Sequence, residues 1–190
     1  RNEPSLALHV MKDDGSEIKQ ISFNQSHDMQ PSVLPNGKIV FSRWDRAPGN
    51  NTINLYQINP DGSQLEILYG RHSHDTGTDA SNVEFASPKP AEDGRLTVSL
   101  RPTTSQHLGG ELAFIDWQNY IDESQPTASS GATGSAQESA TPFMVRSDDQ
   151  VSLGGRFADV FPLLDGTSRL LISWTPCRLD AINDIDEPIF

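Results

Sequence analysis

A short pattern of strand and turn residues recurs along this chain, and it limits the possible folds more than any other feature. The segment Leu8–Ser16 combines apolar residues with Asp-Asp-Gly-Ser, and Leu55–Ser63 repeats the arrangement with Pro-Asp-Gly-Ser. A third copy begins at Leu112. Self-similarity with a period of about 40–60 residues is typical of repeat architectures, and short strands in each repeat favour a β-propeller or a related array.

A second repeated unit consists of two short strands joined by a turn. Its copies are Pro31–Ser42, Pro88–Ser99 and Val160–Ser173, with Asn-Gly or Asp-Gly at each turn. These dipeptides supply the positive φ angles that tight hairpin turns need. No long stretch shows the 3.6-residue apolar period of an α-helix. The sequence therefore predicts an all-β fold of antiparallel hairpins.

Aligned together, the two units predict an incomplete β-propeller of four-stranded antiparallel blades. We expect an outer half-blade at 5–24, whole blades at 27–70 and 82–147, and an inner half-blade at 157–178. Residues 124–142 are small and polar, which predicts a disordered insertion before a closing strand at Phe143–Arg146.

The number of blades leaves two arrangements open. Two whole blades and two half-blades amount to three, whereas propellers usually have at least four. We expect the chain to be a piece of a longer protein. The alternative is a homodimer in which two copies complete a six-bladed ring.

Composition excludes several classes of partner. The formal net charge is −12, which argues against nucleic acid or an anionic membrane surface. No apolar run approaches the length of a membrane-spanning helix, about 18 residues or more. A single cysteine, Cys177, excludes an internal disulfide and a cysteine-based zinc cluster. We expect no cofactor.

The densest group of potential ligands is the segment Arg71–Asp75. Residues two apart share a face of an extended segment, so His72 and His74 could reach one metal ion, with Asp75 or Asp79 nearby. No third histidine is close in the sequence. We therefore interpret the segment as a solvated loop between blades, with a metal or ligand site as the alternative.

Two Ser-His-Asp triplets, Ser26–Asp28 and Ser73–Asp75, contain the residue types of a hydrolase triad. Consecutive residues cannot adopt the geometry of a triad, and the chain has no Gly-x-Ser-x-Gly nucleophile elbow. We predict no catalytic residues, and we expect the triplets to link neighbouring blades.

Arg43 and Trp44 follow the strand expected at Lys38–Ser42. Strand ends lead into the variable connections at the mouth of a propeller. We predict that Arg43 and Trp44, together with His72, His74 and Asp75, contact a protein or small-molecule ligand there.

The unit Asp28–Ser42, followed by Asn54–Ser63, resembles the TolB-like, WD40-type propeller repeat. The resemblance implies the fold and says little about activity. The same unit, taken with Ser173–Arg178, is also similar to propellers akin to the middle domain of the hydrazine synthase alpha subunit. This second resemblance implies a bacterial protein of the periplasm or cell envelope.

These observations predict a non-catalytic binding or interaction module within a larger extracytoplasmic protein. The alternative is an accessory or gating propeller of a larger hydrolase or oxidoreductase whose catalytic domain lies outside this chain.

Overall fold

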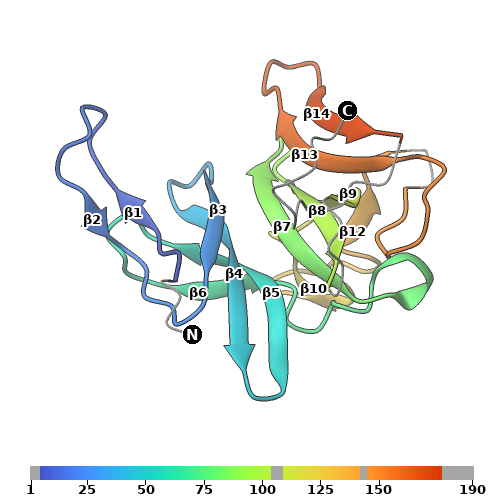
Figure 1. Ribbon diagram of the computed structural model, residues 1–190, viewed down its shortest axis with the longest axis horizontal. Coiled ribbons are helices and arrows are strands. Elements are labelled where there is room, and N and C mark those ends of the chain that lie inside the picture. Colours follow the sequence, from blue (N-terminus) through green and yellow to red (C-terminus); the bar gives the residue numbers. More distant parts are fainter. Residues whose placement is uncertain (1–4, 104–108, 142–144, 177–190) are drawn as a thin grey trace, which may run out of the picture.

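Antiparallel strands joined by tight turns make up the fold (Figure 1). The computed structural model describes residues 5–103, 109–141 and 145–176. Within these ranges there is no α-helix, and the only helical turn is the 3₁₀ helix η1 (Thr78–Ala80). The predicted all-β class is confirmed. No helix in the described ranges is long and apolar enough to cross a membrane.

The first half of the chain forms a hairpin and a four-stranded sheet. The hairpin pairs β1 (His9–Val10) with β2 (Lys19–Gln20). The sheet follows chain order and consists of β3 (Asp28–Val33), β4 (Ile39–Ala47), β5 (Asn50–Ile58) and β6 (Glu66–Tyr69).

The second half repeats this plan. Its four-stranded sheet contains β7 (Val83–Pro90), β8 (Leu96–Pro102), β9 (Glu111–Ile115) and β12 (Gln137–Ser139). A small hairpin of β10 (Tyr120–Asp122) and β11 (Gln125–Pro126) lies between β9 and β12 in sequence. The last hairpin pairs β13 (Arg156–Pro162) with β14 (Leu170–Thr175).

The fourth strand of the second sheet lies earlier than the sequence predicted. β12 falls inside the stretch expected to be disordered, whereas Phe143 and Met144 of the expected closing strand lie outside the described residues. Both hydrogen bonds and the buried Ala136 hold this stretch in place. The Glu123 carboxylate accepts hydrogen bonds from the Ser135 hydroxyl and from the Gln137 N–H, the latter at 3.0 Å.

The predicted hairpin turns share one geometry. In each, a side-chain oxygen of Asp or Asn accepts a hydrogen bond from the backbone N–H two residues later, which is the Asx turn. The pairs are Asp14 with Ser16, Asn36 with Lys38, Asp61 with Ser63, Asp93 with Arg95 and Asp165 with Thr167. The glycine between the members of each pair has positive φ, from 77° at Gly166 to 91° at Gly62.

The main core lies where β7 packs against the first sheet. Phe85 of β7 is fully buried and meets the ring of Tyr69 edge-on, with the ring centroids 5.4 Å apart. The buried hydroxyl of Ser42 donates a 3.0 Å hydrogen bond to the Phe85 carbonyl. On the other side of the second sheet, Gly110 and Phe157 exchange backbone hydrogen bonds of 3.0 Å, which joins this sheet to β13.

Among the described residues, the β1–β2 and β13–β14 hairpins do not complete a sheet with each other. Neither β1 nor β2 pairs with β13 or β14, and the hairpins lie at opposite ends of the molecule (Figure 1). β14 is exposed along most of its length, and its large apolar side chains Leu171, Ile172 and Trp174 face solvent.

Gly70 permits the close approach of Tyr69 and Phe85. Its φ is +104°, and a Cβ atom there would lie 2.7 Å from two ring carbons of Phe85. We expect Gly70→Ala to lower the free energy of unfolding by about 2–4 kcal/mol, because it combines an unfavourable backbone angle with overpacking. Denaturant unfolding measures this loss. Gly131→Ala is the matched control, since a Cβ atom at Gly131 meets nothing within 4 Å. Equal stability of the two variants would contradict the prediction.

Candidate functional site

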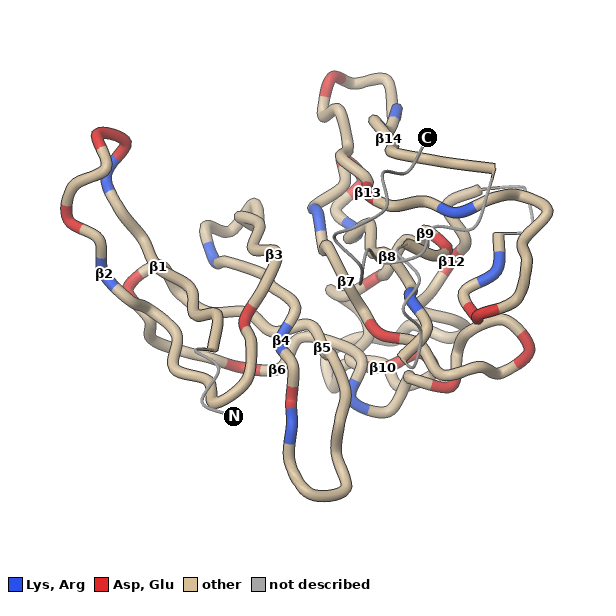
Figure 2. Tube along the Cα trace, viewed as in Figure 1, with Lys and Arg blue, Asp and Glu red and all other residues tan. Residues whose placement is uncertain are grey.

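The β4–β5 hairpin is longer than the strands that flank it, and its far end projects from the sheet (Figure 1). Directly paired residues share one face of a sheet. The register pairs Arg43 with Asn54 and Asp45 with Thr52, so these polar side chains lie on a common face. Figure 2 shows that positive and negative residues follow one another closely along β4.

A hollow of about 450 Å³ opens on this face. We call it the arginine pocket. Its lining includes three cationic side chains, Arg43 and Arg46 of β4 and Arg71 after β6, together with polar side chains of the hairpin. The polar groups on which the site depends are Asp45, Asn54 and Tyr56.

Asp45 organises the polar wall of the pocket. Its Oδ2 accepts hydrogen bonds of 2.9 Å from the Tyr56 hydroxyl and from Asn54 Nδ2. The Arg43 Nε atom lies 3.5 Å from Asp45 Oδ1. The Arg43 guanidinium also lies over the Tyr56 ring, 5.2 Å from its centroid, and its Nη1 is 3.6 Å from the buried Asp28 carboxylate. The wall is therefore held in place by its own contacts.

Arg71 differs from Arg43 because it has no carboxylate or hydrogen-bond partner among the described residues. It is exposed, and its charge is close enough to Tyr56 to oppose the rise in the pKa of that phenol. An exposed, unpaired guanidinium beside a fixed polar wall can bind a carboxylate or phosphate oxygen through charge-assisted hydrogen bonds.

His74 supports the pocket from behind. Its Nδ1 lies 2.6 Å from the Val83 carbonyl oxygen, and its Nε2 lies 2.9 Å from Asn54 Oδ1. Burial lowers the pKa of His74, although the Val83 carbonyl and the carboxylates of Asp122, Asp75 and Asp45 act in the opposite direction. With both ring nitrogens in contact with protein oxygens, His74 positions Asn54 and presents no free nitrogen to a ligand.

The predicted segment Arg71–Asp75 is therefore split in the structure. Arg71 lines the pocket, His74 lies behind it, and His72 and Asp75 are exposed. Among the described residues, no group of three or more His, Cys, Asp or Glu side chains is placed to hold a metal ion.

Trp44 lies on the face of β4 opposite Arg43. Its ring stacks on His27 with centroids 5.4 Å apart, and the Arg46 guanidinium lies 5.3 Å from the centre of the indole ring. The indole N–H donates a 2.8 Å hydrogen bond to Asn51. The sequence grouped Arg43 with Trp44, but neighbours on a strand point to opposite faces, and of the two only Arg43 lines the pocket.

The Ser-His-Asp triplets connect separate elements. The Ser73 hydroxyl donates a 2.8 Å hydrogen bond to Asp122 of β10, and His74 bridges β5 and β7. In the other triplet, His27 Nδ1 accepts a 3.0 Å hydrogen bond from the backbone of Leu6. These contacts agree with the expected linking role.

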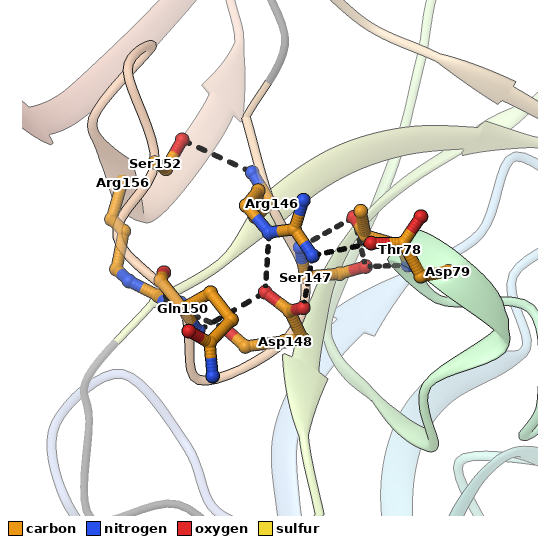
Figure 3. Close-up of polar contacts among 8 residues, drawn as sticks. All are labelled: Thr78, Asp79, Arg146, Ser147, Asp148, Gln150, Ser152 and Arg156. Carbon is orange, nitrogen blue, oxygen red and sulfur yellow. Dashed lines mark hydrogen bonds and ion pairs between the residues drawn. The ribbon is translucent and has the colours of Figure 1, made fainter.

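A second polar cluster, which sequence reasoning missed, joins η1 to residues 145–156 (Figure 3). Arg146 binds Asp148 at 2.5 Å and Asp79 at 2.6 Å, and the hydrogen bond with Arg146 lowers the pKa of Asp148. The buried Ser147 hydroxyl accepts a 2.8 Å hydrogen bond from the Thr78 N–H. Because Arg146 is held between two carboxylates, we interpret the cluster as a structural clasp between distant segments.

Sequence reasoning also missed Asp45, Asn54 and Tyr56. Polar residues at alternate positions of β5 (Thr52, Asn54 and Tyr56) were a signal for a solvated face of the hairpin. Their convergence on Asp45 required the register between β4 and β5.

Comparison with known proteins gives a likeness of fold. No family model matches the chain, and no curated protein matches it. Among solved structures, the chain is similar to hydrazine synthase of Kuenenia stuttgartiensis, with a TM-score of 0.56 and 22% sequence identity. The similarity covers 84% of this chain and 18% of that chain. It agrees with the second resemblance noted in the sequence and concerns the fold alone, whereas the TolB-like resemblance stays a prediction.

The Tyr56 phenol provides a pH-dependent test of the pocket wall. Burial, followed by the hydrogen bond to Asp45, raises its pKa from 10.0 to about 12. The folded state therefore holds the proton more tightly than the unfolded state, and this contribution to stability is complete below pH 10 and lost between pH 10 and about 12. We expect Tyr56→Phe to reduce the alkaline loss of stability measured by urea unfolding.

Tyrosinate absorbance near 295 nm checks the same group directly. The variant should lack one late-titrating phenol. Ionisation of Tyr56 in the folded protein at an ordinary tyrosine pKa would show that the contact with Asp45 does not form.

Proposed function

We propose that this chain is part of a β-propeller and that the propeller is a non-catalytic binding module. Two four-stranded antiparallel sheets with the same strand plan support this architecture. The first strands of these sheets are β3 and β7, and the first strand of the last hairpin is β13. Of these three strands, β7 contacts both β3 and β13. The likeness to the hydrazine synthase structure is consistent with this arrangement.

We propose that the arginine pocket is the binding site, and that it accepts a small molecule with a carboxylate or phosphate group. The observation that carries this proposal is the unpaired Arg71 beside a wall fixed by Asp45. We further propose a periplasmic or cell-envelope location, as the second resemblance implies.

A second candidate function is an accessory or gating propeller of a larger enzyme. The observation that favours it is the similarity to hydrazine synthase, of whose chain only 18% is covered. In that case the pocket would bind a ligand or a neighbouring domain without taking part in chemistry.

Galacturonate and neutral galactose form a matched pair of probes for the pocket. We expect calorimetry to detect galacturonate binding that weakens as salt rises, and much weaker galactose binding. Arg71→Ala should reduce galacturonate affinity by about 10- to 100-fold, the range for loss of a hydrogen bond between charged groups.

Arg169→Ala is the control, because it removes the same charge from the β13–β14 turn. If Arg71→Ala and Arg169→Ala weaken binding equally, general electrostatics and not the pocket explains the affinity. Glucose 6-phosphate against glucose distinguishes a preference for phosphate from one for carboxylate.

A further inference from the structure

Each four-stranded sheet carries an equivalent ion pair that spans its third strand. In the first sheet, Lys38 Nζ lies 2.7 Å from Glu66 of β6. In the second sheet, Arg95 Nη1 lies 2.6 Å from Glu138 of β12. A base before the second strand thus meets an acid on the fourth strand, across the third strand.

The base has a structural equivalent in the last hairpin. The carbonyls of Lys38 and Arg95 accept the closing hydrogen bonds of their turns, from Leu34 and Ala91 respectively, both at 2.8 Å. In the β13–β14 turn, the Arg169 carbonyl accepts the same bond from Leu163 at 3.0 Å. Arg169 therefore occupies the position of the base.

Arg169 is also free to make the equivalent contact. Arg95 uses Nε for Asp93 of its own turn and Nη1 for Glu138. Arg169 uses Nη2 for Asp165 of its own turn, at 2.7 Å, and Nε for Thr167. Its Nη1 has no partner among the described residues, and its side chain is 65% exposed.

In the β1–β2 hairpin, a positively charged residue occupies the position that corresponds to Glu66 and Glu138. Glu66 is paired with Gln57, and Glu138 with Phe114. Val10 of β1 is equivalent to Gln57 and Phe114, because each lies two positions after the leucine that begins its repeat. Val10 is paired with Lys19. Lys19 is exposed, and its charge helps to lower the pKa of Asp61 in the adjacent β5–β6 turn.

Among the described residues, β14 pairs only with β13, whereas the equivalent strands β4 and β8 have a neighbour on each side. Ser42 and Ser99 pair with Leu55 and Leu112 of the third strands, whereas the equivalent Ser173 pairs only with Asp159 of β13 among the described residues. An antiparallel strand with an apolar residue opposite Ser173 would restore the pattern of the complete sheets.

We propose that the open edge of β14 docks a β-hairpin of a partner segment that carries a carboxylate facing Arg169, and that it selects against the β1–β2 hairpin of a second copy. The geometry rests on the propeller architecture proposed above. In a second copy, Lys19 would face Arg169, and like charges in this position are unfavourable. The sign of the charge that faces Arg169 thus determines which hairpin can complete the blade.

Charge reversal in the whole chain tests the proposal. Lys19→Glu supplies the missing acid, and Arg169→Glu supplies an acid opposite Lys19. Each single variant should strengthen self-association, and the double variant should return to the weak association of the unchanged protein. A symmetric dimer contains two such contacts, so we expect about 5- to 30-fold tighter association for each single variant, measured by sedimentation equilibrium.

Lys89→Glu is the control, because it makes the same charge change on β7. Hydrogen exchange of the β14 amides gives a second readout, and these amides should become protected in the Lys19→Glu dimer. Tight dimerisation of the unchanged protein, or a Lys19→Glu variant that associates no more tightly than Lys89→Glu, would overturn the proposal. Dimerisation without β14 protection would overturn the edge assignment. None of these outcomes depends on ligand binding at the arginine pocket.

Discussion

The packing of β7 against the first sheet is the interaction on which the rest of the structure depends. Phe85 fills the space beside Tyr69, and Gly70 keeps that space open because any side chain there would meet the Phe85 ring. The Ser42 hydroxyl then fixes the backbone of β7 through the Phe85 carbonyl. Because β13 packs on the far side of β7, the position of the last hairpin also follows from this contact.

The same packing supports the arginine pocket. His74 reaches from the segment before β7 to Asn54 on β5, so the relation between the two sheets fixes an amide in the wall of the pocket. Asp45 then holds Asn54 and Tyr56 in one arrangement. In a chain of net charge −12, a site with a free arginine is a local exception, and such exceptions favour recognition of an anion.

The repeated ion pairs provide partner selection in addition to stability. An exposed ion pair contributes little to the free energy of folding, about 0–1 kcal/mol. Its sign nevertheless distinguishes strands that are otherwise similar in apolar pattern, which is a recognised use of charge at sheet edges. The ion pairs Lys38–Glu66 and Arg95–Glu138 form within the four-stranded sheets. Arg169 lies at the open edge of β14, where a carboxylate from a docked hairpin would form the equivalent pair.

The sequence alone determined the all-β class, the hairpin turns and the repeated units, because Asx-Gly turns and alternating apolar residues act over a few neighbouring positions. It also singled out Arg43 and Arg71–Asp75. Only the tertiary structure separated Trp44 from Arg43, placed His74 behind the pocket and moved the fourth strand to β12. Those outcomes depend on strand register and on hydrogen bonds between residues distant in sequence, such as Glu123 with Gln137, and no local pattern encodes them.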